Sequence, residues 1–266
     1  MDKEDETPVS DIFLELASET RCEILEILSE KRHRSTEISK KIGASIQETH
    51  RNTARMTETG LLVKDSDGFF NLTDYGRIIT SQISYFEFFR QNRKFFEEHT
   101  VGKIPQKFIQ RIGSLKNCQI ISNVTIVLER LKKLESSAQK ELKIMVNQAW
   151  NEEGKAIVAC VKNGVKVRGI LGKDTIFPKE LIESAEKNIS KLDPNMIEQR
   201  IIESVPISVY ISHKEAGVIF PNLKGEVDMN VLIVSEDPEF RLWCEDIFEE
   251  YWSQGGRFRY DKTHII

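Results

Sequence analysis

The chain has 266 residues, which exceeds the usual size of one domain and predicts two domains with a connector. Hydrophobic residues make up 39% of the sequence, enough for packed cores, so a disordered protein is excluded. The net charge of −4 is unusual for a DNA-binding protein, whose affinity comes largely from neutralised phosphates.

The N-terminus and the cysteines indicate a reduced, cytoplasmic protein. Residues 1–6 are acidic and lack the apolar core of a signal peptide. The longest apolar run, Ala156 to Val161, is far shorter than the ~20 residues of a membrane helix. The four cysteines are scattered without a CxxC pair, which argues against a disulfide framework and a Cys-based metal site. We therefore expect no membrane association, no metal and no cofactor.

Two helices are predicted first. One runs roughly from Ser10 to Glu30, and a shorter one covers about Thr36–Lys41 and stops at Gly43. The apolar stripe of the first helix consists of Ile12, Phe13, Leu16, Ile24, Ile27 and Leu28.

A third, capped helix follows a tight turn. Ser45 is the predicted N-cap, and Glu48, three positions later, completes a capping box. The helix continues to about Thr59 and ends at Gly60. A helix presented in this way fits the major groove of duplex DNA.

A two-stranded ribbon comes next. Leu61–Lys64 and Phe69–Leu72 are the predicted strands, and the Asp67-Gly68 pair between them is a hairpin turn signal. Because acidic residues occupy the tip of this ribbon, we expect weak or purely positional contacts from it to DNA.

The third helix leaves one polar face free. Its Gln and Arg side chains have forked donors that suit the edges of adenine and guanine. Between Lys31 and Arg55 there are seven basic and two acidic residues, 7 − 2 = +5, although a solvated helix face is the plainer reading of this charge. The predicted DNA-binding residues are Ser45, Gln47, His50, Arg51 and Arg55, with Lys40, Lys41 and Lys64 as phosphate contacts.

One long aromatic-rich helix is predicted from Asp74 to about Glu98, with Ile79, Ile83, Phe86 and Phe89 on one stripe. A helix this apolar either packs on the second domain or pairs with another copy of the chain, and we favour pairing.

Beyond residue 104, short apolar runs alternate with helical patterns, which indicates an α/β sheet domain. The predicted strands are Gln119–Ser122, Leu142–Asn147, Val165–Leu171, Ile207–Ser212, Gly217–Phe220 and Met229–Ser235. The predicted helices are Val124–Ala138, Glu152–Asn163, Pro178–Ile189 and Glu239–Ser253. The expected organisation is thus a winged helix-turn-helix domain (10–74), a linker and dimerisation helix (75–99), an α/β sensing and dimerisation domain (100–255) and a polar tail (256–266).

Residues 10–76 resemble the winged helix-turn-helix of ArsR-like and MarR-like transcription regulators. The resemblance rests on Ala17-Ser18-Glu19-Thr20-Arg21, Ile42-Gly43-Ala44-Ser45, Thr59-Gly60-Leu61-Leu62 and Leu72-Thr73-Asp74-Tyr75-Gly76. Metal-sensing members carry a Cys-x-Cys in or near the recognition helix; this chain has none there, so metal sensing is not implied.

Residues 101–253 resemble the C-terminal domain of archaeal regulators of the FilR1 type. The resemblance rests on residues 104–109, on Gly164-Val165-Lys166-Val167-Arg168, on Gly217-Val218-Ile219-Phe220-Pro221 and on Phe240-Arg241-Leu242-Trp243. Such domains look like half of a phospholipase D-type α/β fold that is reused for sensing.

Catalysis is not expected. The phospholipase D reaction needs a nucleophilic His and a Lys two positions later, as His-x-Lys-x4-Asp. Here His213 and Lys214 are adjacent, and no Asp follows at the required place. No Ser-His-Asp order, phosphate-binding glycine loop or paired-carboxylate site stands out either.

A ligand pocket is expected at the carboxyl ends of the strands, where α/β sheets bind small molecules. The candidate ligand-binding residues, each following a predicted strand, are Asn147, Trp150, Lys173, His213 and Lys214. The plainer alternative is that Trp150 begins the next helix and packs into the core.

The sequence therefore predicts a sequence-specific regulator of transcription that binds double-stranded DNA as a homodimer. Its C-terminal domain would sense a small molecule or another signal. The alternative is an adaptor whose winged helix docks a partner protein, and salt dependence separates the two, since DNA binding weakens steeply as salt rises.

Overall fold

The chain folds as two units, one ending at Glu87 and the other beginning at Phe88. The computed structural model describes residues 8–148, 151–176, 193 and 195–257. Over these ranges no helix is both long enough and apolar enough to cross a membrane.

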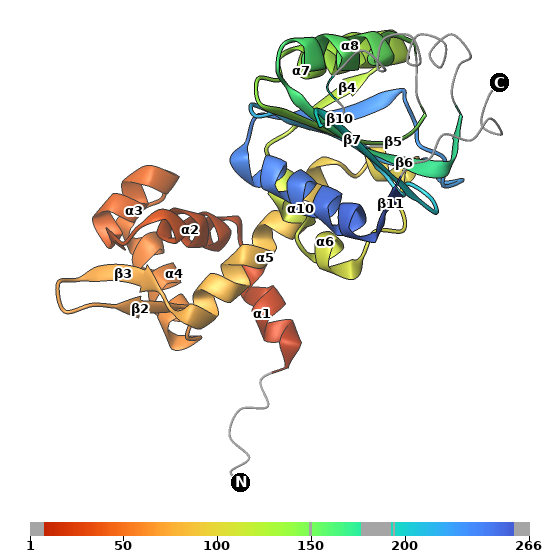
Figure 1. The fold of residues 1–266 in the computed structure, drawn as a ribbon. Coiled ribbons are helices and arrows are strands. Elements are labelled where there is room, and N and C mark those ends of the chain that lie inside the picture. The colour runs from red at the N-terminus through yellow and green to blue at the C-terminus, as the bar shows by residue number, and fades with distance from the viewer. Residues whose placement is uncertain (1–7, 149–150, 177–192, 194, 258–266) are drawn as a thin grey trace. The chain divides into compact units, whose positions relative to one another are not determined.

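The first unit consists of helices and a small antiparallel sheet with the strand order β1-β3-β2 (Figure 1). Its elements are α1 Val9–Leu16, α2 Glu19–Glu30, β1 His33–Arg34, α3 Ser35–Ile42, α4 Ile46–Glu58, β2 Leu62–Lys64, β3 Phe69–Leu72 and most of α5 Asp74–Gln91. The helix-turn-helix and the ribbon confirm the predicted winged-helix fold class. The two-residue strand β1 was not predicted, because it is too short to show periodicity.

The single helix predicted over residues 10–30 is wrong, because two helices occupy this range. Ser18 is extended, and its Oγ accepts a hydrogen bond from the N–H of Arg21 at 3.4 Å. A serine in this role begins a new helix and interrupts the old one. As a result Ile24 and Leu28 are buried as expected, whereas Phe13 on α1 is 54% exposed.

The core of the first unit is formed by apolar side chains of α2, α3, α4, β2 and β3. Nine of them are buried together: Ile24, Leu25, Leu28, Ile38, Met56, Leu61, Leu62, Phe70 and Leu72. Ile79 and Ile83 of α5 pack against this cluster. The predicted apolar stripe of the long helix thus begins by covering its own domain.

Helix α5 is shorter than predicted and ends at Gln91 instead of about Glu98. The side chain of Asn92 donates to the carbonyl oxygen of Phe88 at 2.7 Å, and such local bonds compete with helix continuation. A short 3-10 helix over Phe95–Glu97 follows. The ring of Phe95 lies 6.0 Å from that of Phe220 in the second unit's sheet region.

The second unit is a mixed sheet of eight strands in the order β11-β7-β6-β5-β8-β9-β10-β4. Its strands are β4 Gln119–Ser122, β5 Glu141–Gln148, β6 Lys166–Ile176, β7 Ile197–Ile202, β8 Ser208–Ile211, β9 Ala216–Ile219, β10 Val231–Ser235 and β11 Gly256–Arg257. Its helices are α6 Gln106–Gln110, α7 Val124–Ser136, α8 Asn151–Lys162 and α10 Pro238–Gln254, with a 3-10 turn at Ile112–Leu115.

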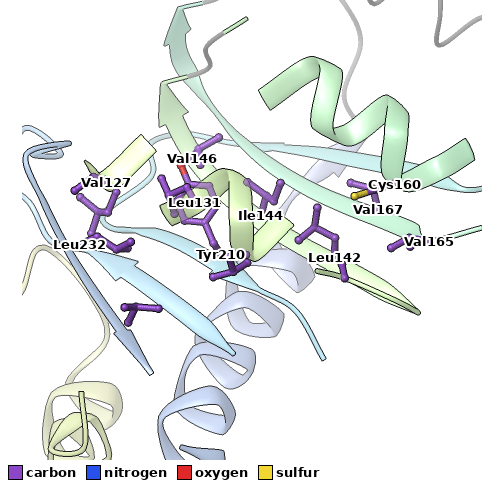
Figure 2. Close-up of a cluster of buried hydrophobic side chains, with 14 of the residues drawn as sticks. Val127, Leu131, Leu142, Ile144, Val146, Cys160, Val165, Val167, Tyr210 and Leu232 are labelled. Atoms are coloured by element: carbon purple, nitrogen blue, oxygen red, sulfur yellow. The ribbon is translucent and has the colours of Figure 1, made fainter. Parts of the chain in front are cut away.

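Helices cover both faces of this sheet (Figure 1). Helices α7 and α8 pack on one face over alternate residues of β5, among them Leu142, Ile144 and Val146, as Figure 2 shows. Helix α10 packs on the other face, where the indole N–H of Trp243 donates to the carbonyl oxygen of Phe108 at 3.0 Å.

The six predicted strands and the first, second and fourth predicted helices of this domain are present, which confirms an α/β sheet domain. Strand β7 was missed because its centre, Glu198-Gln199-Arg200, is polar and shows no apolar run. The predicted polar tail is partly wrong, since Gly256–Arg257 form β11. The predicted helix Pro178–Ile189 and the last residues of the tail lie outside the described residues.

A buried histidine ties the segment after α5 to the second unit's sheet. His99 is 5% exposed; its Nδ1 lies 3.0 Å from the carbonyl oxygen of Phe95 and its Nε2 lies 3.1 Å from Oδ2 of Asp228. Partial burial opposes ionisation of Asp228, but hydrogen bonds from Asn230 and His99 outweigh it and hold the pKa of that carboxyl below its usual value.

Replacing this carboxylate tests its contribution to stability. A carboxyl whose folded pKa is depressed stabilises the fold above its unfolded pKa of about 3.9, and the stabilisation is lost as the pH falls through the folded value. Asp228→Asn should therefore lower the thermal midpoint at pH 7, and the difference from wild type should shrink below about pH 4. Thermal unfolding over a pH series measures this. Asp67→Asn, at an exposed position, is the control and should leave the thermal midpoint at pH 7 close to that of wild type.

Close packing at the start of α5 predicts a second effect on stability. A Cβ added at Gly76 would lie 2.0 Å from the backbone oxygen of Leu61, so the helix must move to accept it. Gly76→Ala should lower the free energy of unfolding by about 1–3 kcal/mol, as overpacking does. Urea unfolding checks this, with Gly256→Ala as the control because no atom lies within 4 Å of its added Cβ. Equal effects of both substitutions would refute the packing argument.

Candidate nucleic-acid interface

A tight turn joins α3 to α4 and sets the direction of the second helix. Gly43 ends α3 in the left-handed conformation with φ 68°, which glycine adopts without strain. The hydroxyl of Ser39 donates to the carbonyl oxygen of Ala44 at 2.8 Å and closes the turn. Ser45 then caps α4 by accepting the N–H of Glu48 at 3.1 Å.

The predicted capping box is only half formed. The carboxylate of Glu48 accepts a hydrogen bond from the hydroxyl of Thr20 on α2, with a distance of 3.3 Å between the oxygens. This contact ties the first turn of α4 to α2, so the N-terminal end of α4 is fixed at two places.

One face of α4 is buried although it is largely polar. Thr49, Asn52, Thr53 and Met56 are all less than one tenth exposed. The hydroxyl of Thr49 donates to the carbonyl oxygen of Ser45 at 3.0 Å, and that of Thr53 to the carbonyl oxygen of Thr49 at 2.9 Å. Because these hydroxyls are satisfied within the helix, the face can be buried without partners elsewhere.

The opposite face of α4 is exposed and carries the predicted base-reading residues. Gln47, His50 and Arg51 all lie there, and Ile46 beside them is 46% exposed. Lys40 and Lys41, in the last turn of α3, are also exposed. Exposure is a condition for contact with a major groove, and these side chains meet it.

Arg55, also a predicted DNA contact, forms an ion pair within its own unit. Its Nε and Nη2 lie 2.8 and 2.7 Å from Oε1 of Glu15 on α1. Glu15 is 6% exposed, and its Oε2 lies 3.2 Å from Nε of Arg21. The buried carboxylate is thus held by two arginines, and the Arg55 guanidinium holds α1 against the end of α4.

One of the two acidic residues at the tip of the ribbon is neutralised by a basic partner. The backbone N–H of Phe69 donates to Asp65 at 2.8 Å, and the Arg32 guanidinium lies 3.0 Å from its other oxygen. These bonds outweigh partial desolvation and hold the pKa of the Asp65 carboxyl below its usual value. Asp65 therefore forms the turn and is paired, which leaves Asp67 as the acidic residue at the tip.

Two arginines of this region were not among the predicted contacts. The guanidinium groups of Arg32 and Arg34 each lie 4.6 Å from the ring centroid of Phe69, within the range of a cation–π contact. On the neighbouring strand, the Lys64 ammonium lies 5.4 Å from the Phe70 ring. Sequence reasoning counted these arginines in the local charge, but it could not place them because β1 was not recognised.

The candidate ligand-binding residues do not form one site. Asn147 lies in β5 and Lys173 in β6, and because these strands are parallel both residues lie towards the carboxyl-terminal end of their strands, at the same end of the sheet. Strand β8 is antiparallel to β5, with Ile211 opposite Lys143, so His213 and Lys214, which follow β8, lie at the other end of the sheet. The prediction of a single pocket from all of them is therefore wrong, and Trp150 lies outside the described residues.

The candidate side chains at the two ends of the sheet have different hydrogen-bond and ion-pair partners. Among the described residues, Oδ1 of Asn147 is buried without a hydrogen-bond partner. Lys173 pairs with Glu203 at 2.5 Å and Lys214 with Glu236 at 3.0 Å. An open groove of about 390 Å³ lies between α6 and α10, but Lys107–Glu250 and Arg111–Asp246 ion pairs occupy its walls.

The fold and the helix-turn-helix define a two-domain protein with a winged-helix-like N-terminal unit and a mixed α/β second unit. Residues 9–94 match the family model of the HVO_A0261 N-terminal domain. Residues 127–254 match that of the middle domain of the methanogenesis regulatory protein FilR1. The chain combines these two domains, which confirms the predicted resemblance to FilR1-type regulators.

Solved structures show a more distant likeness. TrmBL2, an archaeal chromatin protein, aligns over 94% of this chain and 100% of its own, with 12% identity and a TM-score of 0.45. Nuc, a phospholipase D family member from Salmonella typhimurium, aligns over 54% of this chain and 99% of its own, with 17% identity and a TM-score of 0.40. At these scores neither likeness supports a functional conclusion. A comparison with curated proteins gave no match.

The buried carboxylate of Glu15 gives a testable prediction for α1. Glu15→Gln keeps the size of the side chain but removes the charge that two arginines share. We expect amide hydrogens of α1 to exchange about tenfold faster, because the helix opens locally more often. Hydrogen exchange read by mass spectrometry measures this. Glu23→Gln, an exposed position on α2, should leave exchange in α1 unchanged; the same acceleration there would contradict the assignment.

Proposed function

We propose that the protein is a sequence-specific transcription regulator that binds double-stranded DNA as a homodimer. The observation that carries the proposal is the capped helix α4, whose buried face leaves Gln47, His50 and Arg51 exposed together. The match to a domain of a methanogenesis regulatory protein supports a regulatory role. Such a protein would work in the cytoplasm, where the DNA of an archaeal cell lies.

The exposed residues suit distinct parts of a DNA site. Gln47 and Arg51 are one helical turn apart, so both can reach base edges, Gln to adenine and Arg to guanine. His50 and Ser45 would reach bases or phosphates. The phosphate contacts would come from Lys40, Lys41, Lys64 and the ring-stacked Arg34. Arg55 would act indirectly, by holding α1 through Glu15.

An exposed apolar surface on α1 and α5, here called the helical surface, supports pairing of two copies. Its residues are Val9 at 67%, Phe13 at 54%, Ile78 at 63% and Phe86 at 50% exposure. The rings of Phe13 and Phe86 meet edge to face at 6.5 Å, so the two helices form one surface. Apolar surface of this kind commonly marks an interface. A twofold pair would present two α4 helices to a palindromic site, about one DNA turn apart.

The second unit would convert a signal into a change in this pair, as a shift between two populated states. Asn147 and Lys173, at the same end of the sheet, are the remaining candidates for contact with a small-molecule effector. The unpartnered Oδ1 of Asn147 is an acceptor that such a ligand could satisfy. No catalytic role is proposed for His213 or Lys214.

Binding of DNA fragments from the protein's own upstream region tests the proposal. Arg51→Ala should reduce affinity for the specific site by about 1–3 kcal/mol, because a bidentate base contact is lost, with little effect on nonspecific DNA. Arg34→Gln should instead weaken binding to all sequences alike and lower the salt dependence by about one phosphate contact. Fluorescence anisotropy at several salt concentrations measures both.

Two outcomes would count against the proposal. Unchanged specific binding in Arg51→Ala, with the fold intact by circular dichroism, would remove α4 as the reading helix. Absence of DNA affinity even at low salt would reject DNA binding altogether and favour the adaptor that docks a partner protein.

A further inference from the structure

Strand β4 is an edge of the eight-stranded sheet and is unusual in its lack of charge. It pairs with β10 on one side, and among the described residues no strand pairs with its other side. From Asn117 to Leu128 the sequence contains no charged residue. Ile120 in the strand is 42% exposed, and Val124 and Ile126 just after it are 42% and 52% exposed.

The other edge strands in the described parts of the chain carry charged side chains. Strand β11 carries Arg257 and lies beside β7, which carries Glu198 and Arg200. In the small sheet, β1 carries Arg34 and β2 carries Lys64. Charged side chains on an edge prevent pairing with another strand. Because β4 lacks them, its free backbone groups are open to a further strand.

We propose that β4 pairs antiparallel with β4 of a second copy, so that the two sheets join. A second copy is the favoured occupant because antiparallel pairing of identical strands is self-complementary about a twofold axis. It also brings no like charges together, since the segment has none. This contact would be the part of the proposed homodimer interface that the second unit contributes. It rests on the proposed function in one respect: the β4 contact is weak unless the two copies also pair through the helical surface.

Symmetry fixes the register of this pairing. A twofold axis perpendicular to the sheet keeps each side chain on its own face, so directly opposite residues must share a face. One residue is therefore paired with its own copy, and the axis passes midway between the two. Ile121 packs towards the core cluster, and Ile120 lies on the other face. Centring on Ile120 sets the two exposed isoleucines opposite each other, whereas centring on Ile121 would set Ile120 opposite Ser122.

The contact is short and would be weak by itself. Strand β4 has four residues, so two copies exchange only a few backbone hydrogen bonds. Pairing of the helical surface would make the β4 contact intramolecular and raise its effective concentration. The β4 edge would then act as a second contact of the same dimer, within the domain that carries the proposed sensing function.

Cross-linking of the full-length chain tests the register. Opposite residues in antiparallel strands have Cβ atoms about 4.5–5.5 Å apart, close to the range that a disulfide spans. Ile120→Cys should therefore give a covalent dimer on mild oxidation, seen on a non-reducing gel. Native Cys118 would face Ser122 of the other copy, about 13 Å along the strand from its own copy, so the wild type should not cross-link. Ile126→Cys, at a position that is also exposed but lies on α7, is the matched control.

A second variant tests the same contact without thiols. Ile120→Lys places like charges face to face and should raise the dimer dissociation constant by about tenfold in sedimentation equilibrium. The proposal is overturned if Ile120→Cys chains cross-link no more than Ile126→Cys chains, or if Ile120→Lys leaves association unchanged. Specific DNA binding without this cross-link rejects only the β4 contact; the cross-link without DNA binding rejects only the proposed function.

Discussion

The side of α4 that is buried decides what the protein can present to a ligand. Thr49 and Thr53 satisfy their hydroxyls on the helix's own carbonyl oxygens, so a polar face packs inward without needing partners from the core. Met56 completes this face at 0% exposure. Because a helix has only one opposite side, Gln47 and Arg51 must then face outward. The proposed reading of DNA follows from this packing constraint.

The charge of the molecule is organised around the same helix. A net charge of −4 would repel DNA if it were spread evenly. In the first unit, however, two acidic side chains near α4 form ion pairs with arginines. Glu15 is held by Arg21 and Arg55, and Asp65 is held by Arg32. Lys40 and Lys41 have no such acidic partner among the described residues, so their positive charge is available for the proposed phosphate contacts.

Sequence patterns predicted most of the elements but not their directions. Apolar periodicity located α3, α4 and the main strands, since these bury a regular face. It missed β7, whose polar centre lies near a sheet edge, and it merged α1 with α2 because an N-cap serine outweighs a continuous apolar pattern. The single ligand pocket failed for a different reason: the carboxyl ends of strands meet at one end of a sheet only when the strands are parallel, and β8 runs antiparallel to β5. Strand direction depends on long-range pairing, which local periodicity does not encode.

The Glu15–Arg55 pair gives the first unit a means of coupling two surfaces. Helix α1 presents Phe13 on its exposed side and Glu15 on its buried side, and its two turns are too short to bend between them. If a partner that packs on Phe13 displaced α1, Glu15 would move with the helix and would pull on Arg55 in the last turn of α4. Arg55 lies one helical turn from Arg51, so α1 is held directly beside the proposed reading face. Pairing of two copies and the position of the reading helix would then be set by the same rigid element, which is the coupling that a regulator of DNA binding requires.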